Sequence, residues 1–162
     1  LPDWQRRTPR RFAITPAMLD ATIEAQGLSA TVGTGDLLLV RTGQLTRARR
    51  GVDAGEGWGE YAGGPAPGLS FTTAGWLHER EVSAVATDTW GFEVRPNEFD
   101  VAFQPLHQVA IPNMGLTIGE MWDLDRLAAA CAADGRWEFL LVAGALRVTG
   151  AVGAPLNPIA LR

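Results

Sequence analysis

The stretch Gly35-Asp36-Leu37-Leu38-Leu39-Val40-Arg41-Thr42-Gly43 decides the fold class. Its continuous apolar run, bounded by glycines, is typical of a strand that is buried on both faces of a parallel sheet. A helix is expected before this stretch. Thr15-Pro16 is typical of a helix N-terminus, and Gly27 can adopt the left-handed conformation that ends a helix. A second strand of this kind is expected over residues 82–86, after another helix. Strands that alternate with helices predict an α/β domain with a mixed or partly parallel sheet.

The rest of the chain predicts short elements and one long irregular segment. Residues 44–67 carry six glycines and show no periodicity, so a folded-over loop is expected there. The other expected elements are a helix from residue 72 or 73, a short helix over 106–110 that stops before Pro112, a strand at 116–118, a helix from 123 to 135, strands at 137–142 and 146–148, and an extended end.

Length and composition favour one globular domain. The 162 residues are 46% hydrophobic and 20% charged, so a single domain over residues 1–162 is expected, with 1–13 as a connector. The net charge of −4 does not provide the positive surface that nucleic-acid binding needs, so no nucleic acid partner is expected. No apolar run approaches the roughly 20 residues that span a membrane, so no membrane association is expected. No secretory signal is visible, and a cytoplasmic location is therefore expected.

Several kinds of chemistry are excluded by the residues that are missing. The sequence has no lysine, which excludes Schiff-base catalysis and phosphate binding by a Walker lysine, and it has no GxSxG, GxGxxG, HExxH or CxxC motif. The single cysteine, Cys131, excludes a disulfide scaffold. Its place on the inner face of a predicted helix favours an inert core thiol over a nucleophile.

The two histidines differ in their settings. His78 lies among charged neighbours near the end of a predicted helix, which favours a surface residue. His107 lies on a short apolar helix, and Glu120 directly follows an apolar strand. An imidazole and a carboxylate placed in this way can converge on a divalent cation or act as a proton-transfer pair. The alternative is a core histidine and a solvated glutamate.

A second carboxylate, Asp88, also follows an apolar strand. Ligands of open α/β sheets gather at the carboxyl ends of the strands, so Asp88 could line such a site. It could equally cap the following turn through its side chain.

Several segments together resemble the cyclase family of metal-dependent hydrolases, which includes bacterial kynurenine formamidases and isatin hydrolase. The similar stretches are Ile14-Thr15-Pro16, residues 35–43, Pro67-Gly68-Leu69-Ser70, residues 76–80 and 85–89, Pro105-Leu106-His107, and residues 115–125. The resemblance implies a swivelling β/β/α fold with a mixed sheet, and hydrolysis of amide or lactam bonds in small cyclic or aromatic substrates. It also implies a divalent metal, zinc or manganese, with His107 as the active-site histidine and Glu120 as its partner carboxylate, near or on the metal.

The chain departs from the family pattern in one respect. The main metal ligands of the family come from an upstream motif of the form His-x-x-x-His-x-Asp-x-x-x-His, which is absent here. We therefore expect the domain to be incomplete at its N-terminus and its partner to be a missing N-terminal segment that carries the other ligands. A naturally shortened relative, acting as a non-catalytic binding or assembly module on the same scaffold, is the alternative.

Aromatic residues complete the expected site. Trp58, Tyr61, Trp90 and Phe92 could form an apolar wall for a ring-shaped small-molecule substrate, with Asp88 beside them. They could equally be core residues or subunit contacts. Because a fragment of this kind exposes strand edges, a homo-oligomer is expected.

Overall fold

The computed structural model describes residues 11–27 and 32–162. The chain divides into two compact units, Leu1–Arg126 and Leu127–Arg162, and each is described by itself. The single domain expected over residues 1–162 stays a prediction. The expected connector over 1–13 lies mostly outside the described residues, and Phe12 and Ala13 already belong to the first strand.

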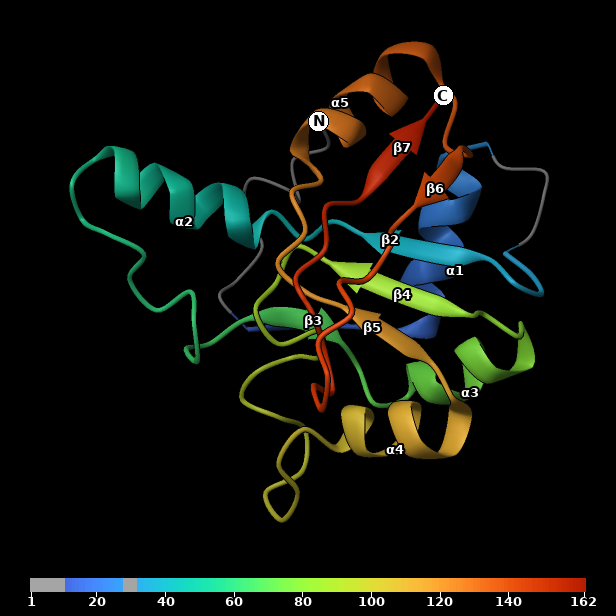
Figure 1. Ribbon diagram of the computed structural model, residues 1–162, viewed down its shortest axis with the longest axis horizontal. Helices are drawn as coiled ribbons and strands as arrows, with labels where there is room; N and C mark the ends of the chain where they lie inside the picture. The colour runs from blue at the N-terminus through green and yellow to red at the C-terminus, as the bar shows by residue number, and fades with distance from the viewer. Residues whose placement is uncertain (1–10, 28–31) are drawn as a thin grey trace. The chain divides into compact units, whose positions relative to one another are not determined.

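The first unit is built on a parallel sheet of three strands. These are β2 (Leu37–Val40), β4 (Ala84–Thr87) and β5 (Thr117–Gly119), in the order β2-β4-β5 (Figure 1). The register pairs Ala86 with Leu39 on one side and with Gly119 on the other. All three strands therefore end at the same edge of the sheet, where side chains that follow them meet.

The first unit also contains a separate parallel sheet of two strands. Strand β1 (Phe12–Ile14) pairs with β3 (Pro67–Leu69), and β3 is buried along its whole length. The second unit adds an antiparallel pair, β6 (Leu140–Val142) with β7 (Ile159–Leu161). The described residues therefore contain both parallel and antiparallel pairing, and the expected α/β class with a mixed arrangement of strands is confirmed.

Three helices of the first unit contribute side chains to the apolar core. These are α1 (Pro16–Ala25), α3 (Thr73–Glu79) and α4 (Pro105–Met114), each of which begins close to an expected start. The apolar core joins them to the strands, and its fully buried members are Leu69, Leu77, Val85, Phe92, Leu106 and Ala110. Burial of these side chains from several elements fixes the position of α4, which carries His107.

The loop expected over residues 44–67 is wrong in its first part, where the chain forms helix α2 (Gln44–Asp53). Leu45, Ala48 and Val52 recur at helical spacing on this helix, but they stand among polar residues, only Gln44 and Leu45 are buried, and Val52 is 39% exposed, so the stripe is weak and was missed. In Figure 1, α2 extends away from the strands of its unit. Gly43, at a φ of 83°, makes the turn from β2 into α2.

Helix α4 does not stop before Pro112, as expected, but continues to Met114. A proline inside a helix removes the N–H that would bond to the carbonyl four residues earlier, here that of Gln108. The side-chain amide of Asn113 donates to this carbonyl at 3.2 Å instead. Gly115, at a φ of 66°, then ends the helix.

The end of the chain differs from expectation in its strands. Helix α5 (Asp125–Asp134) forms as expected, with Cys131 buried and Gly135 at a φ of 71° behind it. The strand expected over 146–148 is wrong, and β6 pairs instead with β7 at the end that was expected to be only extended. Leu146 is 61% exposed, so apolar residues in that segment do not mark a buried strand. Among the described residues, no helix has the length and apolarity needed to cross a membrane.

Candidate active site

His107 and Glu120 lie together, as the sequence predicts. Nε2 of His107 is 3.2 Å from Oε1 of Glu120. His107 stands in the first turn of α4, whereas Glu120 directly follows β5 at the carboxyl edge of the sheet. The two side chains are 17% and 31% exposed, so both can reach solvent or a ligand. The alternative of a buried core histidine apart from a solvated glutamate is therefore not what the structure shows.

A third residue, Glu93, completes the group and was missed by the sequence analysis. Its Oε1 lies 2.7 Å from Nδ1 of His107, and its side chain is only 3% exposed. The available signal was a single carboxylate between two apolar residues, Phe92 and Val94. A buried charge at such a position needs partners, which indicates a specific contact.

The two carboxylates control the charge of the His107 ring. Burial lowers the pKa of His107, but the hydrogen bonds to Glu120 and Glu93 and the charges of both carboxylates outweigh this effect and raise its pKa to about 9. The ring is therefore positively charged at neutral pH when only protein groups surround it. A metal ion at Nε2 would compete with the proton that this nitrogen holds.

The two carboxylates that follow neighbouring strands have different surroundings. Asp88 is 1% exposed, and its carboxylate accepts hydrogen bonds from the Thr42 N–H at 2.7 Å, the Thr42 hydroxyl at 2.8 Å and the Gly43 N–H at 2.7 Å. It therefore holds the turn between β2 and α2, which is not the turn that follows Asp88 itself. Glu120 faces His107 instead. A substrate-pocket role for Asp88 stays a prediction.

The predicted aromatic wall is split between the core and the surface. Phe92 is fully buried and meets the His107 ring edge-on, with 5.6 Å between the ring centroids. The hydroxyl of buried Tyr61 donates to the Asp88 carbonyl at 3.0 Å. Trp58 packs against Tyr61 but is 53% exposed, and Trp90 lies under the guanidinium of Arg95.

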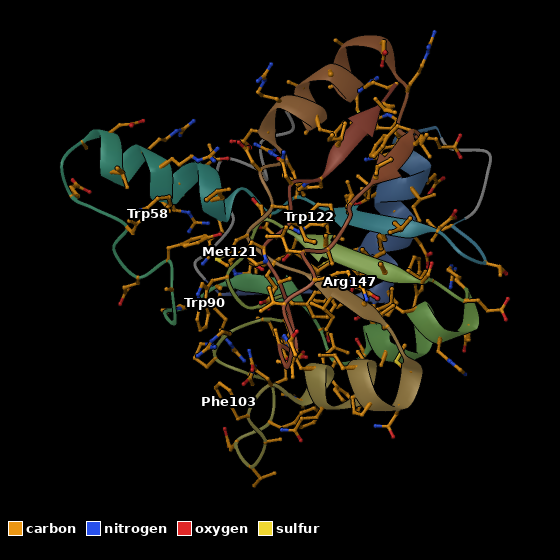
Figure 2. All side chains as sticks on the ribbon, in the orientation of Figure 1. Trp58, Trp90, Phe103, Met121, Trp122 and Arg147 are labelled. Atoms are coloured by element: carbon orange, nitrogen blue, oxygen red, sulfur yellow. The ribbon has the colours of Figure 1, made fainter. Side chains whose placement is uncertain are left out.

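Of these aromatic residues, Phe92 shapes the site by packing against its histidine. Figure 2 shows Trp90 and Met121 beyond the arrowheads of the strands, at the edge where Glu120 lies. Trp90 therefore lies at the same edge of the sheet as Glu120. The wall that the sequence predicts stays a prediction for Trp58, Tyr61, Trp90 and Phe92.

The donors present fit part of a metal site. Glu93 is occupied by its protein partners, which leaves Nε2 of His107 and the carboxylate of Glu120 for a cation. Within residues 11–27 and 32–162, no group of three or more His, Cys, Asp or Glu side chains is arranged to hold a metal ion. An imidazole nitrogen and a carboxylate are suitable ligands for zinc or manganese, but hydrolytic sites use three or more protein ligands.

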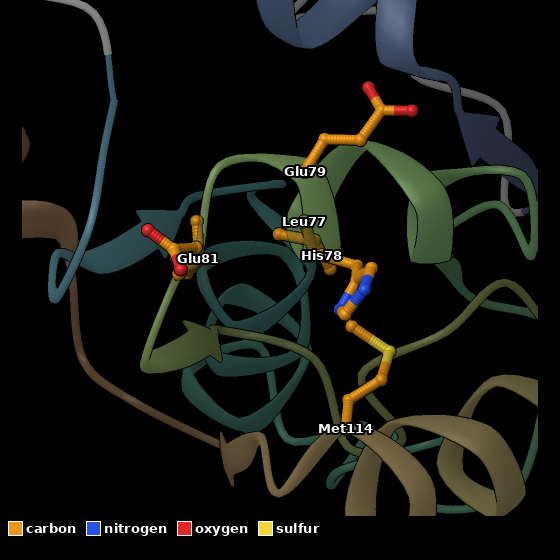
Figure 3. Close-up of a pocket in the computed structure, with 6 residues that line it drawn as sticks. Leu77, His78, Glu79, Glu81 and Met114 are labelled. Atoms are coloured by element: carbon orange, nitrogen blue, oxygen red, sulfur yellow. The ribbon is translucent and has the colours of Figure 1, made fainter.

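A hollow of about 570 Å³ lies at the opposite end of the sheet, near the start of β4 (Figure 3). His78 and Met114 line it and approach each other, while Glu79 points away from both. His78 is exposed, as expected for a surface residue. The diverging side chains give this hollow no convergent set of donors, so the His107 group is the candidate site.

A family model and several solved structures match this chain. The Cyclase family model matches residues 2–94, which is more than half of the chain. The chain belongs to the cyclase family. A cyclase described as novel is similar at 35% identity and a TM-score of 0.77, covering 93% of this chain and 47% of that one. A sequence search among curated proteins returns no match.

Two more distant cyclase-like structures share the fold. An isatin hydrolase bound to the product analogue thioisatinate matches 94% of this chain and 54% of its own, at 16% identity and a TM-score of 0.70. Isatin hydrolase A from Ralstonia solanacearum matches 99% of this chain and 57% of its own, at 18% identity and a TM-score of 0.68. The chain thus spans about half the length of the structures it matches. The family resemblance seen in the sequence is confirmed.

Proposed function

We propose that this cyclase-family chain forms part of a metal-dependent hydrolase that cleaves an amide or lactam bond in a small cyclic or aromatic substrate. The observation that carries the proposal is the contact of His107 with Glu120 at 3.2 Å, at the carboxyl edge of a cyclase-type sheet. This edge is where open α/β sheets bind ligands. The similar structures include isatin hydrolases and one described as a potential metal-dependent hydrolase with cyclase activity.

The proposed metal is a divalent cation, zinc or manganese. When bound, such a cation lowers the pKa of coordinated water toward 7 and polarises a carbonyl. His107 would bind it through Nε2 and Glu120 through its carboxylate, and further ligands would come from a segment outside this chain. The oxygen of Glu120 that does not bind the cation could accept or return a proton, since this side chain is 31% exposed.

Substitution of His107 tests this function in the full-length gene product. We expect His107→Ala to lower amide or lactam hydrolysis at least 100-fold and to reduce bound zinc or manganese, because it removes a proposed ligand. The matched control is His78→Ala, which removes the other histidine from an exposed position. Unchanged hydrolysis in His107→Ala would show that the site assignment is wrong.

A non-catalytic binding or assembly module is the second candidate. It is favoured by the small number of donors, because the described residues leave only His107 and Glu120 for a cation. Metal analysis of the full-length gene product separates the two functions. Stoichiometric metal supports the hydrolase, and its absence together with absent hydrolysis supports the module.

A further inference from the structure

Helix α4 begins without a capping side chain of its own. Its N-cap residue, Gln104, makes no side-chain cap bond, and Pro105 has no N–H to satisfy. The N–H groups of Leu106 and His107 are instead donated to the carboxylate of Glu93, at 3.2 and 3.1 Å. Gln108 donates to the Gln104 carbonyl at 3.2 Å. Glu93 therefore completes the start of the helix from a distant part of the chain.

The same carboxylate also contacts the imidazole. Oε1 of Glu93 lies 2.7 Å from Nδ1 of His107 and 3.1 Å from the backbone nitrogen of the same residue. One oxygen thus fixes both the backbone and the ring of His107. Since Nδ1 is held against Glu93, the other ring nitrogen, Nε2, faces outward to Glu120.

The surroundings of Glu93 leave its carboxylate little freedom. The side-chain NH₂ of Asn97 donates to Oε2 of Glu93 at 3.3 Å. The side-chain oxygen of Asn97 accepts from the Gln104 N–H at 2.9 Å. On the other side, Phe92 packs edge-on against the ring that Glu93 holds. The carboxylate accepts from four donors, all of them provided by the protein.

We propose that Glu93 is the positioning residue of His107, holding Nδ1 of the ring inward so that Nε2 is presented to a cation beside Glu120. A carboxylate that serves only as a helix cap would need the two backbone N–H groups and nothing more. Here the contact with Nδ1 is the shortest of the four. A carboxylate behind a metal-binding histidine is a known way to orient the ring and to raise its basicity. The orientation is independent of the proposed function, whereas its use in metal binding rests on it.

Nitrogen NMR of the histidine rings tests the orientation directly in this chain. The chain has two histidines, so His78→Gln assigns the signals of His107. At a pH where the ring is neutral, we expect the remaining proton on Nδ1, protected from exchange with solvent. On addition of Zn²⁺ alone, Nε2 should shift while Nδ1 keeps its proton. A neutral ring with its proton on Nε2 would overturn the proposal without any variant.

Glu93→Gln adds a functional readout. A glutamine keeps the shape, but its amide NH₂ faces donors whichever way it turns, so contacts are lost. We expect both ring tautomers to be populated and the affinity for Zn²⁺ to fall at least tenfold. The matched control is Glu98→Gln, because Glu98 likewise accepts from a backbone N–H, that of Phe71 at 2.6 Å, without contacting His107.

The outcomes separate the positioning role from a purely structural one. An unchanged tautomer and equal Zn²⁺ affinities in the Glu93→Gln and Glu98→Gln variants would overturn the proposal. Thermal unfolding of both variants shows whether any loss of affinity follows loss of fold. If Zn²⁺ shifts neither nitrogen in the wild type or in the full-length protein, the proposed metal function fails, and the Nδ1 proton alone then decides the orientation.

Discussion

Gly68 lies so close to the backbone of Glu93 that a Cβ at position 68 would stand 2.3 Å from the Glu93 carbonyl carbon. The opposing atoms belong to the main chain and cannot rotate away. Glycine at this point therefore allows β3 to approach the segment that carries Glu93. The close approach gives a structural reason for the Pro67-Gly68-Leu69 stretch.

Gly68→Ala should displace the segment that carries Glu93. We expect the free energy of unfolding to fall by about 2 kcal/mol, the typical cost of overpacking, and the Nδ1 proton of His107 to lose protection. Urea denaturation and histidine NMR measure the two effects. Gly75→Ala is the control, because nothing lies within 4 Å of a Cβ there and α3 gains a better helix former. Equal stability of both variants would contradict the prediction.

Asp88→Asn should weaken the turn between β2 and α2. Both oxygens of Asp88 accept from Thr42 or Gly43, so an amide NH₂ must face an N–H donor in the variant. We expect the free energy of unfolding to fall by about 2 kcal/mol, as for other buried groups left unsatisfied. Urea denaturation measures this, with exposed Asp100→Asn as control. A change below 0.5 kcal/mol, roughly the size of surface effects, would disprove this role for Asp88.

The charge of His107 should make stability depend on pH in the metal-free chain. The pKa of His107 is about 9 in the folded chain, above the ordinary 6.5, so its protonation stabilises the fold fully below pH 6.5. This contribution is lost as the pH rises through 9. Between these pH values, we expect the wild type to lose about 2 kcal/mol more of its free energy of unfolding than His107→Gln. Parallel pH profiles of the two proteins would contradict this.

Removal of metal should destabilise the full-length gene product if the proposed function holds. A metal present at 100 times its dissociation constant stabilises the folded state by about 2.7 kcal/mol. We therefore expect a chelator to lower the Tm of the wild type clearly and that of Glu120→Gln much less. Differential scanning calorimetry with and without chelator makes the measurement. An equal shift in both proteins would place the metal away from Glu120.

The sequence predicted those elements that are continuously apolar along the chain. The expectation that the strand over 37–40 is buried on both faces is wrong, because β2 lies at an edge of its sheet, with Leu37 exposed and its other residues half-buried. The apolar run at residues 37–40 and the carboxylate that follows β5 both leave a local mark, so β2 and the position of Glu120 could be inferred. Helix α2 was missed, because its apolar spacing of Leu45, Ala48 and Val52 is short and lies among polar residues, and only its first turn is buried. The continuation of α4 past Pro112 is accompanied by a side-chain bond from Asn113 to the Gln108 carbonyl, which no local pattern reveals.

The candidate site was predicted only where its residues stand in a local sequence pattern. His107 and Glu120 were paired correctly because each stands where an element of the sheet edge begins or ends. Glu93 was missed because its partners lie on α4 and are brought to it only by tertiary packing. Asp88 and Glu120 look equivalent in the sequence, and only the structure separates them, by their burial and by their hydrogen-bond partners.

Glu93 binds both the first turn of α4 and the ring of His107, so local opening of that turn also releases the ring. When the first turn of α4 opens, the carboxylate loses the Leu106 and His107 amides, and the ring loses its anchor in the same event. Amide hydrogen exchange at these two residues therefore reports how often the histidine swings free. A mutation that strengthens this turn would stiffen the site from a distance, without touching the imidazole.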